Sequence, residues 1–171
     1  LTEVYRKRAL VPLNERQYTP GVALPPLDVE GVGVGLGICL DSVVPTLARD
    51  AVVRGAQMLV YLTDDAFAGR TVMPIMHLRH TVLRAVETGR WVVFANQSGP
   101  SAFVDPFGRI RQRLEYGETA GAVLPLPALV GVTPFVRFGD WLGPLAILSL
   151  VAGLAVRGSS EGGEVEEAAS A

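Results

Sequence analysis

The sequence predicts an α+β fold in which strands and helices alternate before a hairpin, layered around a mixed sheet. Three observations favour it. The chain has 171 residues, 49% hydrophobic and 19% charged, which is enough for one domain with a sizeable core. Short apolar runs alternate with stretches of helical periodicity. Glycine and proline lie between these stretches, where turns are expected.

The first half of the chain predicts loop, strand, helix and strand in that order. Residues 1–31 are rich in proline and glycine and are expected to be mostly loop, with a short strand near Leu10 and Val11. Residues 32–38 predict a strand with valine, leucine and isoleucine on one face and glycines on the other, where another backbone can approach closely. A helix over 45–54 and a buried strand over 58–62 follow.

The second half predicts a longer helix and further strands. A helix is expected over 72–88, because apolar residues recur on one face and Gly89 is a stop signal. The apolar face consists of Ile75, Leu78, Val82 and Val86. The strands that follow are expected at 91–95, at 101–105 and 110–114 as a hairpin, and at 121–126.

The sequence divides into three expected regions. Residues 1–136 form the layered domain. Residues 137–157 are expected to form a transmembrane helix, because 141–156 carry no charge, with a buried terminal helix as the alternative. The acidic, low-complexity residues 158–171 predict a disordered tail.

Composition excludes several function classes. A net charge of −2 without a long basic run argues against a nucleic-acid-binding surface. One cysteine permits neither an internal disulfide nor a zinc site built on a cysteine pair. The chain starts at Leu1 without a signal-peptide pattern, which favours a piece of a longer protein.

Three sets of residues are candidates for chemistry. Cys39, between a strand and a helix, is either a nucleophile or a small buried residue. Lys7 and Glu15 either share a polar pocket, where each stabilises the other's charge, or lie in a solvated loop. His77 and His80 have one metal-ligand spacing but lack a third ligand, and "TDDAFAG" lacks the alternating ligands of a calcium loop. We therefore expect no metal and no cofactor.

Six ordered segments carry a family resemblance: "YRKRALVPLNE", "ICLD", "GAQMLVYLTDDAFAG", "PIMHLRHTVLRAVE", "ANQSGPSAFVDPFGRI" and "TPFVRFGDW". From Tyr5 to Trp141 the chain resembles apolipoprotein N-acyltransferases, the membrane members of the nitrilase (carbon–nitrogen hydrolase) superfamily. The resemblance implies the C-terminal half of a four-layer α-β-β-α nitrilase-like sandwich, followed by an apolar transmembrane helix.

The resemblance also implies roles for residues. Cys39 falls on the nucleophile that carries an acyl thioester, Lys7 on the lysine that stabilises the oxyanion, and Glu15 on a second glutamate that lines the site. The family's general base, a glutamate in an upstream block, has no counterpart in this sequence. The implied substrate-binding residues are Leu40, Asp41, Asp65, Phe67 and Asn96.

The implied reaction is acyl transfer in two steps. Cys39 takes an acyl chain from a phospholipid and passes it to the N-terminal amine of a diacylglyceryl lipoprotein. The implied location is the bacterial inner membrane, with the catalytic domain on the periplasmic side. Leu40 and Asp41 stand where the family usually has an aromatic residue and a glutamate, and Asp64 and Phe67 where it has asparagine and tryptophan. A related amide hydrolase and a non-catalytic remnant are the alternatives.

Overall fold

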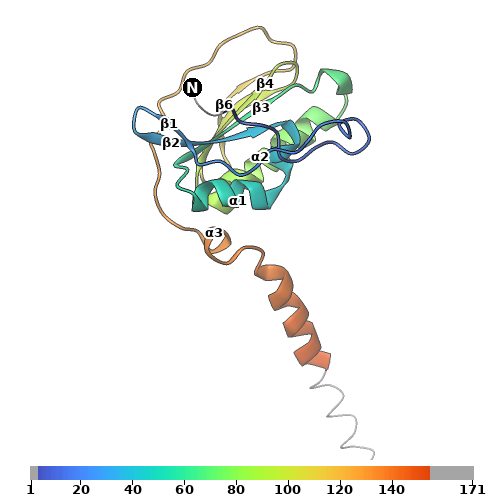
Figure 1. Ribbon diagram of the computed structural model, residues 1–171, viewed down its shortest axis with the longest axis vertical. Helices are drawn as coiled ribbons and strands as arrows, with labels where there is room; N and C mark the ends of the chain where they lie inside the picture. Colours follow the sequence, from blue (N-terminus) through green and yellow to red (C-terminus); the bar gives the residue numbers. More distant parts are fainter. Residues whose placement is uncertain (1–3, 155–171) are drawn as a thin grey trace, which may run out of the picture. The chain divides into compact units, whose positions relative to one another are not determined.

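The computed structural model describes residues 4–154 (Figure 1). The elements are β1 (Leu27–Val29), β2 (Val32–Ile38), the 3-10 helix η1 (Cys39–Val43), α1 (Pro45–Val53), β3 (Met58–Thr63), the 3-10 helix η2 (Ala66–Ala68), α2 (Met73–Thr88), β4 (Trp91–Asn96), β5 (Ser101–Val104), β6 (Ile110–Leu114) and α3 (Pro134–Phe138). The chain divides into two compact units between Arg137 and Phe138. The first unit contains the sheet and the candidate site.

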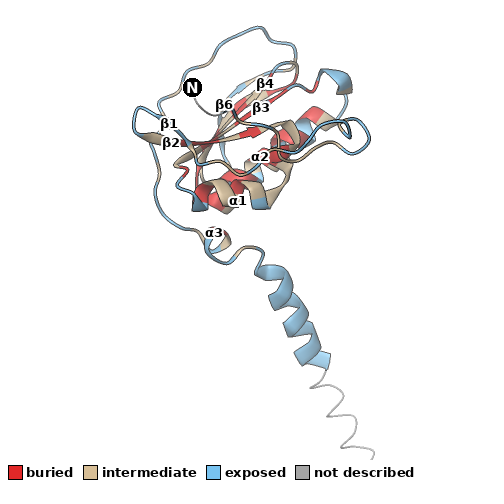
Figure 2. Cartoon of the chain, viewed as in Figure 1, coloured by how far each residue is buried: buried red, intermediate tan, exposed pale blue. Residues whose placement is uncertain are grey.

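The predicted mixed sheet is confirmed. Its six strands follow chain order from β1 to β6, with β2, β3 and β4 parallel and the remaining pairs antiparallel. Parallel neighbours need crossover connections, and α1 and α2 supply them. Both helices lie on the same side of the sheet, and the residues between helix and sheet are buried (Figures 1 and 2). The described residues thus form one sheet and one helix layer.

The glycines of β2 allow α1 to pack against the sheet. A Cβ atom on Gly35 would lie 3.0 Å from the Cβ atoms of Ala51 and Ala56, closer than side chains normally approach. A Cβ atom on Gly37 would lie 2.5 Å from the ring of Tyr61. The glycine face of β2 is therefore the side that faces the helices. The groups that approach these glycines closely are side chains of α1, of β3 and of the loop between them.

The buried face of α2 differs from the predicted one. Ile75 and Val86, expected on the buried stripe, are 40% and 48% exposed. The stripe is instead formed by Pro74, His77, Leu78, Thr81, Arg84, Ala85 and Thr88. The threonine hydroxyls donate to backbone carbonyls of α2 itself, so their burial leaves no unpaired hydroxyl.

Two predictions about strands are wrong. No strand forms near Leu10 and Val11, where the chain makes bends and turns. No strand forms at 121–126, which has no ladder partner among the described residues. The described part of 1–31 is mostly loop, as predicted, but its end contains β1, which pairs antiparallel with β2. A strand needs a hydrogen-bonded neighbour, which local patterning alone does not provide.

The second unit contains a helix over 142–154. Across residues 4–154, no helix combines the length and the apolar character required to cross a membrane. The transmembrane helix expected over 137–157 extends past the described residues and stays a prediction. The tail expected at 158–171 lies wholly outside them.

Candidate active site

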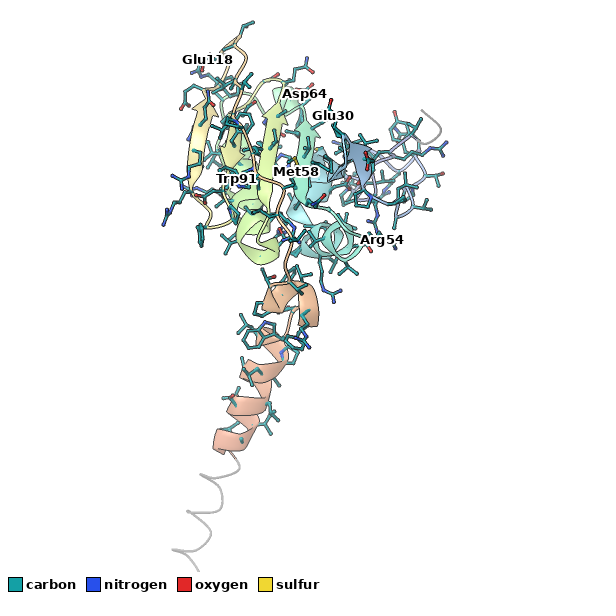
Figure 3. The ribbon with its side chains drawn as sticks, turned by 90° about the vertical axis from the view of Figure 1, so that its left-hand side faces the viewer. Glu30, Arg54, Met58, Asp64, Trp91 and Glu118 are labelled. Atoms are coloured by element: carbon teal, nitrogen blue, oxygen red, sulfur yellow. The ribbon has the colours of Figure 1, made fainter. Side chains whose placement is uncertain are left out.

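Cys39 sits at the edge of the sheet where the three parallel strands end. It directly follows β2, while Asp65 lies just beyond β3 and Asn96 is the last residue of β4. Figure 3 shows Asp64 at this edge and the paired residues Met58 and Trp91 at the start of the same strands. Ligands of open sheets commonly bind at the carboxyl ends of parallel strands.

The backbone of Cys39 is in the left-handed region. Its φ is 49°, one of three positive values among the non-glycine residues described. This conformation costs about 1–2 kcal/mol for a residue with a side chain, so it persists only where the surroundings hold it. The thiol belongs to a half-buried residue and is the only one in the chain.

Asp41 joins the Cys39 turn to the N-terminal segment. Its side chain is buried and accepts hydrogen bonds from four groups. The Ile38 amide donates to Oδ2 at 2.9 Å, and the amides of Arg8 and Ala9 donate to Oδ1 at 3.1 and 2.6 Å. The Tyr5 hydroxyl donates to Oδ2 at 2.9 Å. Burial, and then the charge of Asp41, raise the pKa of Tyr5 above its usual range. Asp41 is predicted to bind substrate, but its hydrogen bonds hold the N-terminal segment against the Cys39 turn.

Lys7 and Glu15 form an ion pair beside this junction. The Lys7 Nζ atom lies 2.8 Å from Oε1 and 2.7 Å from Oε2 of Glu15. The Val11 amide donates to Oε2 of Glu15 at 2.6 Å. Of the two alternatives that the sequence left open, the structure has the shared polar pocket, with side chains 13% and 25% exposed. Because Arg8 is bound to Asp41, Lys7 is held next to the turn that carries Cys39.

The ion pair leads to a pH-dependent prediction. Hydrogen bonds from Lys7, and then from the Val11 amide, hold the pKa of Glu15 below its usual value. A lowered pKa contributes stability above the unfolded-state value of about 4.3, and this stability is lost as pH falls through the folded-state value. We expect Glu15→Gln to cost about 1 kcal/mol at pH 7 and much less at pH 3, measured by urea unfolding. Exposed Glu30 provides the control, Glu30→Gln; an equal cost for Glu15→Gln at both pH values would contradict the prediction.

A second polar cluster lies behind Cys39. The Nδ2 atom of Asn96 donates to Oδ2 of buried Asp65 at 2.7 Å, and Nδ1 of His77 lies 3.1 Å from Oδ1 of Asp65. Burial raises the pKa of Asp65, but the hydrogen bonds from His77 and Asn96 outweigh it and lower the pKa. Asp65 and Asn96, both predicted to bind substrate, are therefore bound to each other.

The other predicted residues differ in exposure. Leu40 is half-buried within η1, and Phe67 in η2 is 73% exposed. The sequence interpretation missed Tyr5, Ser42 and the contact of His77 with the turn. Ser42 was detectable in principle, because a serine three residues after Cys39 can bond back to its carbonyl, and its Oγ does so at 3.0 Å.

The geometry agrees with similarity to known proteins. The family model described as "Carbon-nitrogen hydrolase" matches residues 1–124. An apolipoprotein N-acyltransferase of Gloeobacter violaceus is 42% identical over 124 residues, covering 70% of this chain and 24% of the relative. One from Nitrosomonas europaea is 33% identical over 141 residues, covering 81% and 27%. The chain thus spans about a quarter of the length of the curated relatives it matches.

Solved structures show the same fold. An amidase of the nitrilase superfamily from Nesterenkonia AN1 is 30% identical, with a TM-score of 0.56, and the match covers 66% of this chain and 45% of the amidase. A carbon–nitrogen hydrolase from Helicobacter pylori, 19% identical with a TM-score of 0.58, supports the fold over 66% of this chain and 48% of its own. The structure is a nitrilase-like α/β sandwich, and the chain belongs to the carbon–nitrogen hydrolase family.

Proposed function

We propose that the chain is the part of an apolipoprotein N-acyltransferase that carries the nucleophile. One observation carries the proposal: Cys39 occupies a left-handed turn that Asp41 ties to the segment bearing the Lys7–Glu15 ion pair. A nucleophile and a fixed cation are thereby held by one buried carboxylate. The identity to curated N-acyltransferases favours acyl transfer over other reactions of the family.

In the proposed reaction, the thiolate of Cys39 attacks the ester carbonyl of a phospholipid. The carbonyl oxygen becomes an oxyanion, which the ammonium of Lys7 stabilises, and Glu15 holds Lys7 in place. The carbon–oxygen ester bond then breaks, the departing lysophospholipid oxygen takes up the proton that the Cys39 thiol gave up, and a thioester remains on Cys39. The amine of a lipoprotein attacks this thioester, loses a proton to the base or to solvent, forms an amide and releases the thiolate.

Two parts of the proposal depend on groups beyond those described. Among residues 4–154, no carboxylate is hydrogen-bonded to the Cys39 thiol, so the proposed reaction requires a base from elsewhere. We also propose that the catalytic residues act at the periplasmic face of the bacterial inner membrane, attached through 137–157. Leu40, Phe67 and the Asp65–Asn96 pair would border the acyl site.

Amide hydrolysis is a second candidate, favoured by the amidase structures. One amidase related at 31% identity carries a covalent addition at its active-site cysteine. Cys39, as the only cysteine here, is the one residue that could play that part. The two candidates share the nucleophile. They differ in the acyl donor, a phospholipid ester or an amide, and in the acceptor, an amine or water.

The test is acylation of the 171-residue chain by phosphatidylethanolamine vesicles at pH 9, where a thiol ionises without a base. Intact-mass measurement is expected to show one added acyl chain, absent from Cys39→Ser. Incubation with small amides, with release of ammonia as the readout, tests the second candidate. Ammonia release without an acyl adduct would replace transfer by hydrolysis, and neither product would contradict both and leave a non-catalytic role.

A further inference from the structure

His77 forms a buried cluster around the backbone of Cys39 rather than its thiol. The residue is 6% exposed and lies in the first half of α2. Its Nε2 atom lies 3.1 Å from the carbonyl oxygen of Cys39 and 2.8 Å from Oγ of Ser42. The Ser42 hydroxyl in turn donates to the same carbonyl. His77 therefore contacts the carbonyl of Cys39, while Asp41 contacts the amide of the preceding Ile38.

The partners of His77 restrict which of its ring nitrogens carry hydrogen. A carbonyl oxygen only accepts, so an N–H group at Nε2 donates to Cys39, whereas an unprotonated Nε2 accepts from the Ser42 hydroxyl. An ionised carboxylate also only accepts, and both oxygens of Asp65 lie 3.1–3.2 Å from Nδ1. The ring donates in both of these contacts, to the Cys39 carbonyl and to Asp65, only when both nitrogens carry hydrogen. The charge of that form would be balanced by Asp65, which the Asn96 side chain holds at 2.7 Å.

The contact with Asp65 leaves the Nε2 side of the His77 ring directed at the turn. Asp65 is fully buried and bonded to both His77 and Asn96, so it is fixed in place. The edge of the His77 ring also meets Phe94 of β4, with centroids 5.2 Å apart. Asp65, Phe94 and the Cys39 turn thus confine the ring, and its Nε2 atom faces the Cys39 carbonyl.

We propose that His77 is a positioning residue for Cys39, acting as a fixed imidazolium. Its hydrogen bond fixes the peptide group that follows Cys39 and so the left-handed backbone that presents the thiol. Its positive charge, one hydrogen bond from the same residue, favours the ionised thiol over the neutral one. This inference rests on Cys39 being the reactive group of the proposed function, but not on the acyl donor or acceptor.

Other charged groups around the turn enter the pH dependence of Cys39. They are Asp41 in η1, Lys7 in the N-terminal segment, Asp65 beyond β3, and Arg84 of α2, whose Nη1 donates to the Val43 carbonyl. All of them are retained in His77 variants, so a change in the pH profile of a folded His77 variant reports on His77 itself.

The test follows alkylation of the chain by iodoacetamide across pH 6–10, read by intact mass. The chain has a single cysteine, so each adduct reports on Cys39. His77→Gln is expected to move the midpoint of the rate profile upward by about one pH unit and to slow alkylation at pH 7 about tenfold. His80→Gln is the matched control, three residues along α2, and is expected to leave the profile unchanged. A folded His77→Gln chain, as judged by circular dichroism, with the wild-type profile would overturn the proposal.

A second measurement does not require a His77 variant to fold. Nitrogen-15 NMR of the wild-type chain reports protonation of each imidazole nitrogen, and the chain has only two histidines, which His80→Gln distinguishes. Both nitrogens of His77 are expected to be protonated at pH 7; one unprotonated nitrogen would overturn the proposal. Neither readout uses a phospholipid, so a failure of acyl transfer leaves this test intact.

Discussion

Replacing Lys7 with methionine is expected to slow acylation of Cys39 by phospholipid about 100-fold, the typical loss when an oxyanion partner is removed. Alkylation of the same thiol by iodoacetamide at pH 9 is expected to stay within about twofold, because that reaction forms no oxyanion. Lys7 is the only lysine of the chain, so no second ammonium can replace it. The comparison therefore separates stabilisation of the oxyanion from reactivity of the thiol. Both rates come from intact-mass time courses.

The control for Lys7→Met is Arg6→Met. Arg6 is exposed and adjacent in sequence, and its removal takes away one positive charge without touching Glu15. Arg6→Met is expected to acylate at the wild-type rate. Equal losses for both variants would show that only local positive charge matters, and an unchanged rate in Lys7→Met would contradict the proposed role.

Replacing Asp41 with alanine is expected to lower the free energy of unfolding by about 3 kcal/mol, measured by urea denaturation. The carboxylate is 1% exposed and accepts from three backbone amides and the Tyr5 hydroxyl. Each donor left unpaired in a buried site costs about 1–3 kcal/mol, and the amides nearest the surface recover part of this by binding water.

The matched control for Asp41→Ala is Asp28→Ala. Asp28 is exposed and accepts one hydrogen bond, from the Gly31 amide at 3.0 Å. Its loss is expected to cost less than about 1 kcal/mol. Asp41→Asn retains one acceptor oxygen and is expected to fall between the two. A cost for Asp41→Ala no larger than that for Asp28→Ala would show that the N-terminal segment is held by other contacts.

The order of elements could be read from the sequence, but the inner face of α2 could not. Alternating and helical periodicities located β2, β3, β4 and both long helices within a residue or two of their bounds. Periodicity assumes that apolar side chains point inward. Thr81 and Thr88 break this assumption, because their hydroxyls bond to carbonyls one turn earlier and become inexpensive to bury.

The candidate site was predictable residue by residue, but its connections were not. Sequence motifs singled out Cys39, Lys7 and Glu15, and the last two are only eight positions apart in one loop segment. The contacts that join this segment to the Cys39 turn link residues 32 to 36 positions apart through Asp41. Such contacts depend on how the chain folds back over the sheet, which no local pattern specifies. The role of His77 escaped for the same reason, because its partner is a backbone carbonyl 38 positions away.

The N-terminal segment has a consequence for how the site opens. Residues 4–26 contain no helix or strand, so their amides lack the ladder that protects β2. Local opening of such a segment requires less free energy than global unfolding. Lys7 would leave with it, while Cys39 would stay at the end of β2. Hydrogen exchange should therefore be faster at 4–26 than in β2, with the Arg8 and Ala9 amides, which Asp41 holds, the slowest of the segment.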